Sequence, residues 1–133
     1  MIVQHIAADS ANTLAKLLGR ASALQVKEAE ECELIQAGTV YISAANYHLL
    51  VEMNSTLSLS TDAPVSFARP SIDILFESAA MAFGAGLIAV ILTGSNSDGS
   101  LGMKKVAEKG GITIIQDPTD DEVPFMPYAA LRA

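Results

Sequence analysis

The fold is decided by residues 87–100, which read LIAVILTGSNSDGS. The first six residues are apolar, the middle is small and polar, and a helix-like pattern begins at Leu101. This change is typical of a buried parallel strand that ends in a loop at the carboxyl edge of a sheet. Open α/β sheets bind ligands and carry catalytic groups at that edge. Asp98 is the only ionisable side chain of the loop, so it is the first candidate site residue.

The rest of the chain alternates between strand and helix patterns. Alternation of this kind predicts a parallel sheet, and the two apolar runs around Asn54-Ser55 predict a β-hairpin. We expect Gly19 to end the first helix, with Asp9 or Ser10 as its N-cap, and Gly110-Gly111 to close the last. The expected helices are residues 11–18, a segment after Pro70 with an apolar stripe from Ile72 to Phe83, and 101–109. The expected strands are 2–3, 24–26, 40–42, 49–53, 56–60, 87–92 and 112–115.

Composition excludes several functional classes. The chain has 133 residues, of which 50% are hydrophobic, and a net charge of −7 with only 8 Lys and Arg. Nucleic-acid binding needs basic side chains to neutralise phosphates, so we expect no nucleic-acid partner. No apolar run approaches the roughly 18 residues of a membrane span, and no signal peptide opens the chain. A single cysteine, Cys32, allows no internal disulfide. A cytoplasmic protein without direct membrane insertion is therefore expected.

His5 follows an apolar strand end, as Asp98 does. A His and an Asp at two strand ends are two members of a nucleophile–base–orienter triad. Simpler interpretations exist for both residues. A histidine near a terminus is often only a polar surface residue, and Asp98 or Ser100 could be the N-cap of a helix that starts near Gly99. For His48, at the start of the hairpin, structural hydrogen bonding is the favoured role.

Neither a metal site nor a nucleophile stands out. Two histidines and one cysteine without close spacing form no ligand set, so no metal is expected. None of the 12 serines lies in a Gly-x-Ser-x-Gly elbow. The glycines of residues 84–86 lie between a helix and a strand, which is the wrong order for a phosphate-binding loop and indicates a helix stop.

Six segments taken together resemble the CheB-type protein-glutamate methylesterase domain in order and spacing, over essentially the whole chain. The helix that begins at Arg69-Pro70-Ser71 and the loop that ends at Asp98-Gly99 are the most specific. The segments are Gln4-His5, residues 26–30, 38–42 and 69–80, residues 91–94 with Asp98-Gly99, and residues 116–118 with Met126-Pro127.

The resemblance implies a fold and an activity. The fold would be α/β, Rossmann-like and three-layered, with a doubly wound, mainly parallel sheet, helices on both faces and a β-hairpin. The activity would be hydrolysis of γ-glutamyl methyl esters on methyl-accepting chemotaxis receptors by a Ser/His/Asp triad, with no cofactor. His5 would be the general base and Asp98 the carboxylate that orients it. At positions 95 and 96 this chain has Ser and Asn where the most familiar family loop has Met and Gly, which puts a substrate contact of that Met position in doubt.

The family's opening strand and Gly-rich serine loop would precede Met1. We therefore expect residues 1–133 to be a single, N-terminally truncated methylesterase domain without a receiver domain, inactive by itself. The alternative is a catalytically inactive module of the same fold that binds a receptor or another partner. An exposed sheet edge would favour self-association of either. An unrelated α/β protein for a small ligand would depend on neither His5 nor Asp98.

Overall fold

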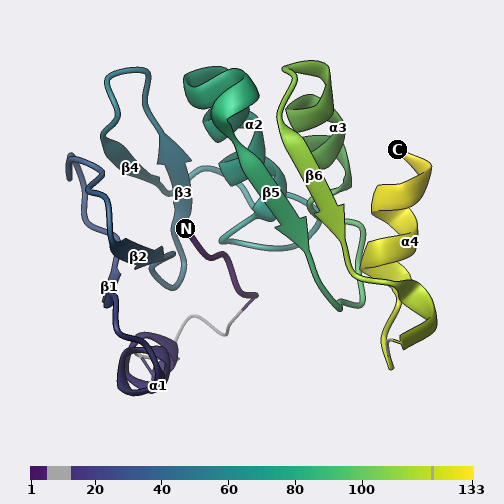
Figure 1. Cartoon of the computed structure of the whole chain (residues 1–133), viewed down its shortest axis with the longest axis horizontal. Helices are drawn as coiled ribbons and strands as arrows, with labels where there is room; N and C mark the ends of the chain where they lie inside the picture. Colours follow the sequence, from purple (N-terminus) through teal and green to yellow (C-terminus); the bar gives the residue numbers. More distant parts are fainter. Residues whose placement is uncertain (6–12, 121) are drawn as a thin grey trace. The chain divides into compact units, whose positions relative to one another are not determined.

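The computed structural model describes residues 1–5, 13–120 and 122–133. These form two compact units, the N-terminal unit (Met1–Ser71) and the C-terminal unit (Ile72–Ala133), each treated separately below. Figure 1 shows the elements in chain order: α1 (Thr13–Ala21), β1 (Gln25–Glu28), β2 (Thr39–Ile42), β3 (His48–Val51), β4 (Leu57–Ser60), α2 (Ile72–Phe83), η1 (Gly84–Gly86), β5 (Ile88–Ile91), α3 (Ser100–Glu108), β6 (Ile112–Ile115), η2 (Pro118–Asp120) and α4 (Phe125–Arg132).

In the N-terminal unit, β1 and β2 form a parallel pair. Ile2 extends the pair as an isolated parallel bridge to Ile42. The Ile2 N–H donates to the Tyr41 carbonyl at 2.8 Å, and the Ser43 N–H donates to the Ile2 carbonyl at 2.9 Å. The predicted strand at the start of the chain is thus present as a single bridged residue, three positions before His5.

The hairpin of the N-terminal unit is confirmed. β3 and β4 are antiparallel, with Leu49 opposite Leu59. The predicted turn lies between them, where the Asn54 side chain accepts the Thr56 N–H at 3.2 Å. Leu49 and Leu57 have no exposed surface and Leu59 is half-buried, so the apolar face of the hairpin is largely buried.

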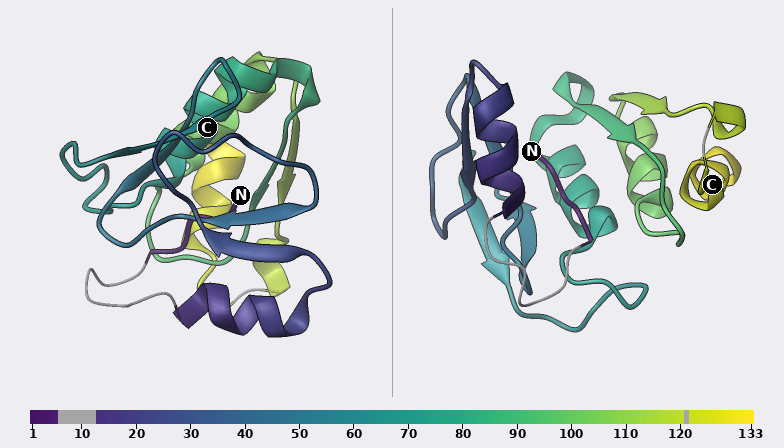
Figure 2. Two further views of the ribbon diagram at one scale, coloured as in Figure 1. Left: turned by 90° about the vertical axis from the view of Figure 1, so that its left-hand side faces the viewer. Right: turned by 90° about the horizontal axis from the view of Figure 1, so that it is seen from below.

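In the C-terminal unit, β5 and β6 are parallel and α3 connects them, which confirms the predicted strand–helix–strand unit. Figure 1 shows the two strands side by side with their arrowheads pointing the same way. The right-hand view of Figure 2 shows α3 alongside both strands. Gly110, with a φ of +81°, follows the end of α3 as predicted, because a left-handed residue there favours glycine.

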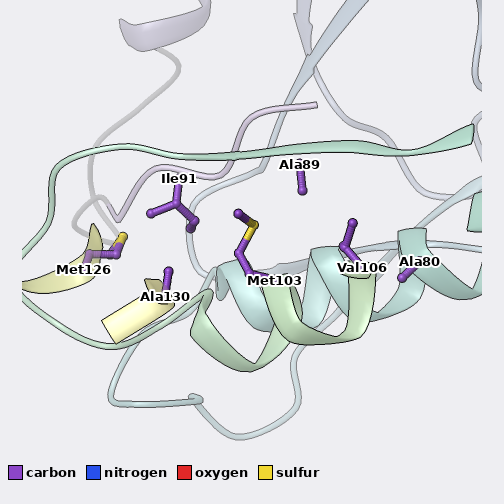
Figure 3. Packing of buried hydrophobic residues seen from close by; sticks show 7 residues of the cluster. All are labelled: Ala80, Ala89, Ile91, Met103, Val106, Met126 and Ala130. Carbon is purple, nitrogen blue, oxygen red and sulfur yellow. The ribbon is translucent and has the colours of Figure 1, made fainter. Parts of the chain in front are cut away.

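The core of the C-terminal unit lies between this strand pair and the helices. Ala89 and Ile91 point from β5 toward Met103 and Val106 of α3 (Figure 3). Met126 of α4 closes the same cluster. Every second side chain of β5 therefore packs against the helices, because successive side chains of a strand point to opposite faces.

The opposite face of the strand pair corrects one prediction. Residues 87–92 are predicted to form a buried strand, yet Ile88 and Val90 are 59% and 47% exposed, and Ile112 and Ile114 of β6 are 56% and 49% exposed. A wholly apolar sequence is compatible with a strand that is covered on one face and with a strand that is covered on both. Within the C-terminal unit, the helices cover only the face that carries Ala89 and Ile91.

The end predicted for α1 is wrong. Gly19 lies inside the helix, which continues to Ala21. A glycine in a helix interior costs about 1 kcal/mol relative to alanine, an amount that packing of a helix on a strand can outweigh. The buried residue of α1 is Ala15, whereas Leu17 is 62% exposed. Asp9 and Ser10 lie outside the described residues.

Among the described helices, none has the length and apolar character that crossing a membrane requires.

Candidate active site

The loop from β5 to α3 has a backbone that only glycine permits at its end. Gly99 is the N-cap of α3 with a φ of +96° and offers no side chain to the helix. A Cβ at Gly99 would lie 2.6 Å from Ile91 Cδ1 and 2.8 Å from Ile72 Cγ2. One residue earlier, the Asp98 N–H donates to Asn96 Oδ1 at 3.0 Å. The loop is therefore closely packed on both sides of the candidate carboxylate.

The Asp98 side chain has no exposed surface and caps a neighbouring helix. Its Oδ2 accepts the Ile72 N–H at 2.7 Å, and its Oδ1 accepts the Asp73 N–H at 3.0 Å. These donors are the first two residues of α2, where the helix dipole favours a negative charge. The interpretation of Asp98 or Ser100 as the cap of the following helix is wrong: Gly99 holds that position and Ser100 is already helical.

Asp73 is a second buried carboxylate that sequence analysis missed, and it is 4% exposed. Its Oδ1 accepts the Gly102 N–H, in the first turn of α3, at 2.7 Å. Asp98 thus caps α2 while Asp73, on α2, caps α3. We call this arrangement the crossed aspartate caps. Nothing in the sequence marks Asp73, because an acidic residue in the first turn of a helix is ordinarily solvated.

Burial is the main cause that raises the pKa of Asp73 above its ordinary value, and the negative charges of Asp98 and Glu77 raise it further. The N–H groups of Gly102 and Gly99 oppose the shift without cancelling it. Burial penalises the charged form of a carboxyl more than these donors stabilise it. The folded protein therefore holds a proton on Asp73 more tightly than the unfolded chain does.

This shift predicts a pH dependence of stability. As the pH falls through the raised folded-state pKa toward the ordinary value of 3.8, the wild type should gain stability relative to Asp73→Asn. The variant has no carboxyl group to protonate at this position. Urea unfolding of both proteins at intervals between about pH 7 and about pH 4 measures the difference. A difference in the free energy of unfolding that stays constant over this range would contradict the raised pKa.

The loops that follow β5 and β6 are tied together. Gln116, directly after β6, accepts the Thr93 N–H through its side-chain Oε1 at 3.0 Å. The Gly94 N–H donates to the Val123 carbonyl at 3.1 Å, and the Met126 N–H donates to the Gly94 carbonyl at 3.0 Å. Gln116 and Met126 therefore lie at a strand end and at a helix start. Their bonds fix the loop upstream of Asp98.

The two histidines differ in their surroundings. His5 is half-buried in the N-terminal unit, whereas Asp98 belongs to the C-terminal unit, so their pairing stays a prediction. His48 is buried: its Nδ1 accepts the Ser71 N–H at 3.2 Å, and its Nε2 lies 3.1 Å from the Ala63 carbonyl. Both ring nitrogens of His48 are engaged with backbone groups, which agrees with the structural role predicted for it.

The remaining candidates add no site. Cys32 is exposed, and its Sγ lies 3.6 Å from Glu31 Oε1. This contact with a surface carboxylate gives Cys32 no feature of a catalytic cysteine. Among the side chains that the structure describes, no three His, Cys, Asp or Glu residues are grouped so as to hold a metal ion.

Residues 1–133 match the family model described as CheB methylesterase. The chain belongs to the CheB methylesterase family. A relative in Leptospira interrogans is 47% identical over 133 residues, which are 100% of this chain and 69% of its own length. A "Protein-glutamate methylesterase/protein-glutamine glutaminase 1" of Rhodospirillum rubrum is 40% identical over 135 residues, 99% of this chain and 35% of its own length. The "Protein-glutamate methylesterase FrzG" of Myxococcus xanthus is 42% identical over 128 residues, which are 96% of this chain and 38% of its own length.

A solved structure supports the same family. The CheB methylesterase catalytic domain of Thermotoga maritima matches with a TM-score of 0.91 and 34% sequence identity, over 98% of this chain and 70% of that chain. This likeness confirms the predicted Rossmann-like α/β class, and the family match confirms the resemblance. The CheB-family chain spans about a third of the length of the Rhodospirillum and Myxococcus relatives.

Proposed function

We propose that this CheB-family chain supplies the general base and the orienting carboxylate of a protein-glutamate methylesterase. His5 is the base, Asp98 orients it, and the two units act as one domain. The observation that carries the proposal is the Asp98 carboxylate, which is fully buried and held at both oxygens by the N–H groups of Ile72 and Asp73. Relatives that bear the methylesterase name support it. The proposed substrates are γ-glutamyl methyl esters on chemotaxis receptors.

The Asp98 environment suits a triad carboxylate. Two helix N–H groups stabilise its negative charge, and a carboxylate oxygen can accept more than one hydrogen bond. In the proposed arrangement, His5 donates its Nδ1–H to Asp98, which leaves Nε2 free to take a proton. Asp98 then stabilises the positively charged imidazolium ring that forms.

The reaction needs a nucleophilic serine, which we propose comes from outside these residues because no serine here lies in an elbow motif. The serine Oγ attacks the γ-carbonyl carbon while His5 Nε2 takes its proton. His5 returns that proton to the departing methoxide, and methanol leaves. Water then attacks the acyl-enzyme while His5 again takes a proton. His5 passes this proton to the serine Oγ, which releases the γ-carboxylate of the receptor's glutamate residue and restores the serine.

The glutaminase part of the name of the Rhodospirillum relative favours a second candidate reaction, the deamidation of glutamine. The same steps apply, with ammonia leaving in place of methanol. Because a leaving amine must be protonated, this reaction would depend on His5 at least as strongly as ester hydrolysis does. Release of ammonia from a glutamine-bearing receptor peptide would report it.

Ring nitrogen NMR of the 133-residue chain tests the proposal without an added nucleophile. The chain has two histidines, so His5→Gln assigns the signals by removing one set. We expect the His5 ring to carry its proton on Nδ1 in the wild type, since that nitrogen donates to Asp98. Asp98→Asn should abolish this preference, whereas Glu77→Gln, at an exposed position of α2, should leave it unchanged.

Other outcomes would contradict parts of the proposal. Unchanged His5 ring shifts in Asp98→Asn would exclude the pairing of the two residues. Hydrolysis of a methyl-esterified receptor peptide by the chain alone, lost in His5→Gln, would show that the nucleophile is among these 133 residues. Receptor binding that survives both substitutions, without any hydrolysis when a serine is supplied, would favour the inactive binding module.

A further inference from the structure

We propose that Asp73 is a positioning residue, which fixes the Asp98 carboxylate by holding both Asp98 and the first turn of the helix that follows it. Asp73, Asp98 and Gly102 all belong to the C-terminal unit. The consequence of this positioning for catalysis rests on the function proposed above, in which Asp98 orients His5.

The two contacts of Asp73 enclose a short piece of chain. Its backbone N–H donates to Asp98 Oδ1 at 3.0 Å, and its own Oδ1 accepts the Gly102 N–H at 2.7 Å. Asp98 and Gly102 are four residues apart, at the end of the loop and in the first turn of α3. One residue of α2 therefore braces both ends of the segment from which the Asp98 side chain projects.

The start of α3 depends on this brace because its own N-cap cannot supply an acceptor. Gly99 has no side chain, and the Ser100 N–H is satisfied locally by the Ser97 carbonyl at 3.1 Å. An N-cap side chain normally accepts the N–H of the second or third helical residue. Gly102 is that third residue, and Asp73 accepts its N–H from the neighbouring helix.

The close approach of α2 and α3 makes this reach possible. A Cβ at Gly102 would lie 2.6 Å from Phe76 Cβ and 3.1 Å from Asp73 Cα, so only glycine permits the observed spacing. The Asp73 side chain is 4% exposed, and the bond to Gly102 is correspondingly shielded from water. A shielded hydrogen bond to a carboxylate is among the stronger and more directional ones.

The charge pattern favours positioning over simple stabilisation. Burial and the neighbouring Asp98 charge raise the pKa of Asp73, so the charged form of this carboxyl group is disfavoured at this position. Well-packed apolar side chains often replace buried charges without loss of stability. A costly buried acid that touches both Asp98 and its helix is consistent with a requirement for a fixed Asp98.

The test compares four proteins: wild type, Asp73→Ala, Asp73→Asn and Glu77→Gln. Asp73→Ala removes the acceptor, Asp73→Asn keeps a carbonyl oxygen there, and Glu77→Gln removes an exposed charge one turn further along α2. Amide hydrogen exchange is followed at Gly102 and Ile72, with Val106 as the core reference. His5 ring nitrogen shifts report the consequence for the proposed base.

In Asp73→Ala we expect exchange at Gly102 and Ile72 to rise about tenfold relative to Val106, the change that loss of one hydrogen bond produces. The His5 ring should move toward its state in Asp98→Asn. Asp73→Asn should restore most of the protection, and Glu77→Gln should match the wild type. Faster exchange at Gly102 with unchanged Ile72 and His5 would overturn the proposal, because Asp73 would then only cap α3.

Asp73→Ala could instead accelerate exchange at Val106 as well, by destabilising the whole unit. Asp73→Glu then decides, since it keeps the charge but moves the acceptor by one methylene group. Wild-type exchange at Ile72 and wild-type His5 shifts in that variant would overturn the proposal. If Asp98→Asn itself leaves His5 unchanged, the proposed function fails, while the exchange at Ile72 still tests whether Asp73 holds Asp98.

Discussion

Replacing Asp98 with Ala should lower the free energy of unfolding by about 3 kcal/mol, from the loss of two charge-assisted hydrogen bonds at a helix N-terminus. The Ile72 and Asp73 N–H groups would lose their common acceptor, in a place where Asp98 has no exposed surface. Water reaches such donors only if the loop opens. Urea unfolding followed by circular dichroism measures the change.

The matched control for this prediction is Glu77→Ala, which removes an exposed acidic side chain from the helix that Asp98 caps. We expect it to change the free energy of unfolding by less than about 0.5 kcal/mol, as is usual for surface substitutions. A similar effect of both variants would show that net charge, rather than the capping bonds of Asp98, sets the stability. Asp98→Asn should fall between them, because its amide can accept only one of the two N–H groups.

Ile91→Ala should destabilise the protein by about 3 kcal/mol, within the usual range for removing a large aliphatic side chain from a core. Ile91 is 1% exposed and packs in the cluster with Met103 and Met126, so the substitution leaves a cavity lined by apolar side chains. The loss combines the transfer free energy of the missing carbons with the cavity they leave. Chemical denaturation is again the measurement.

Val90→Ala is the control for Ile91, one residue away on the same strand but pointing to the other face. Since Val90 is 47% exposed, we expect a loss below about 1 kcal/mol. The ratio of the two losses reports how differently the faces of β5 are covered. Losses of equal size would mean that the face with Val90 is packed in solution, contrary to its exposure in the structure.

Much of the fold could be predicted because its signals are local. Pro70 and the apolar spacing after it define α2, the alternation of Leu57 with polar neighbours defines the second arm of the hairpin, and Gly110 marks the end of α3. The errors arose where tertiary packing decides. Gly19 is held in a helix against its propensity, and the run around Val90 does not reveal which faces of its strand are covered.

The candidate site could be predicted only in part. Asp98 is predicted because it is the one charge in a strand-end loop, and His5 because it follows an apolar strand end at a position where the family resemblance implies a catalytic histidine. The sequence could not show that Asp98 caps α2, since the donors Ile72 and Asp73 lie 26 and 25 residues away. For the same reason Asp73 passed as an ordinary helix residue. Contacts between residues that are distant in the sequence produce no periodic pattern by which they could be predicted.

The crossed aspartate caps also have a consequence for the order of folding. Neither α2 nor α3 can satisfy its N-terminal N–H groups through these caps until the other has docked. Helices of 12 and 9 residues are marginal in isolation, so each depends on its neighbour to persist. We expect docking of the two helices to close the 25-residue span between Asp73 and Asp98 and to form both caps together. The Asp98 carboxylate, which we propose to orient His5, would then reach its final position when α2 and α3 dock.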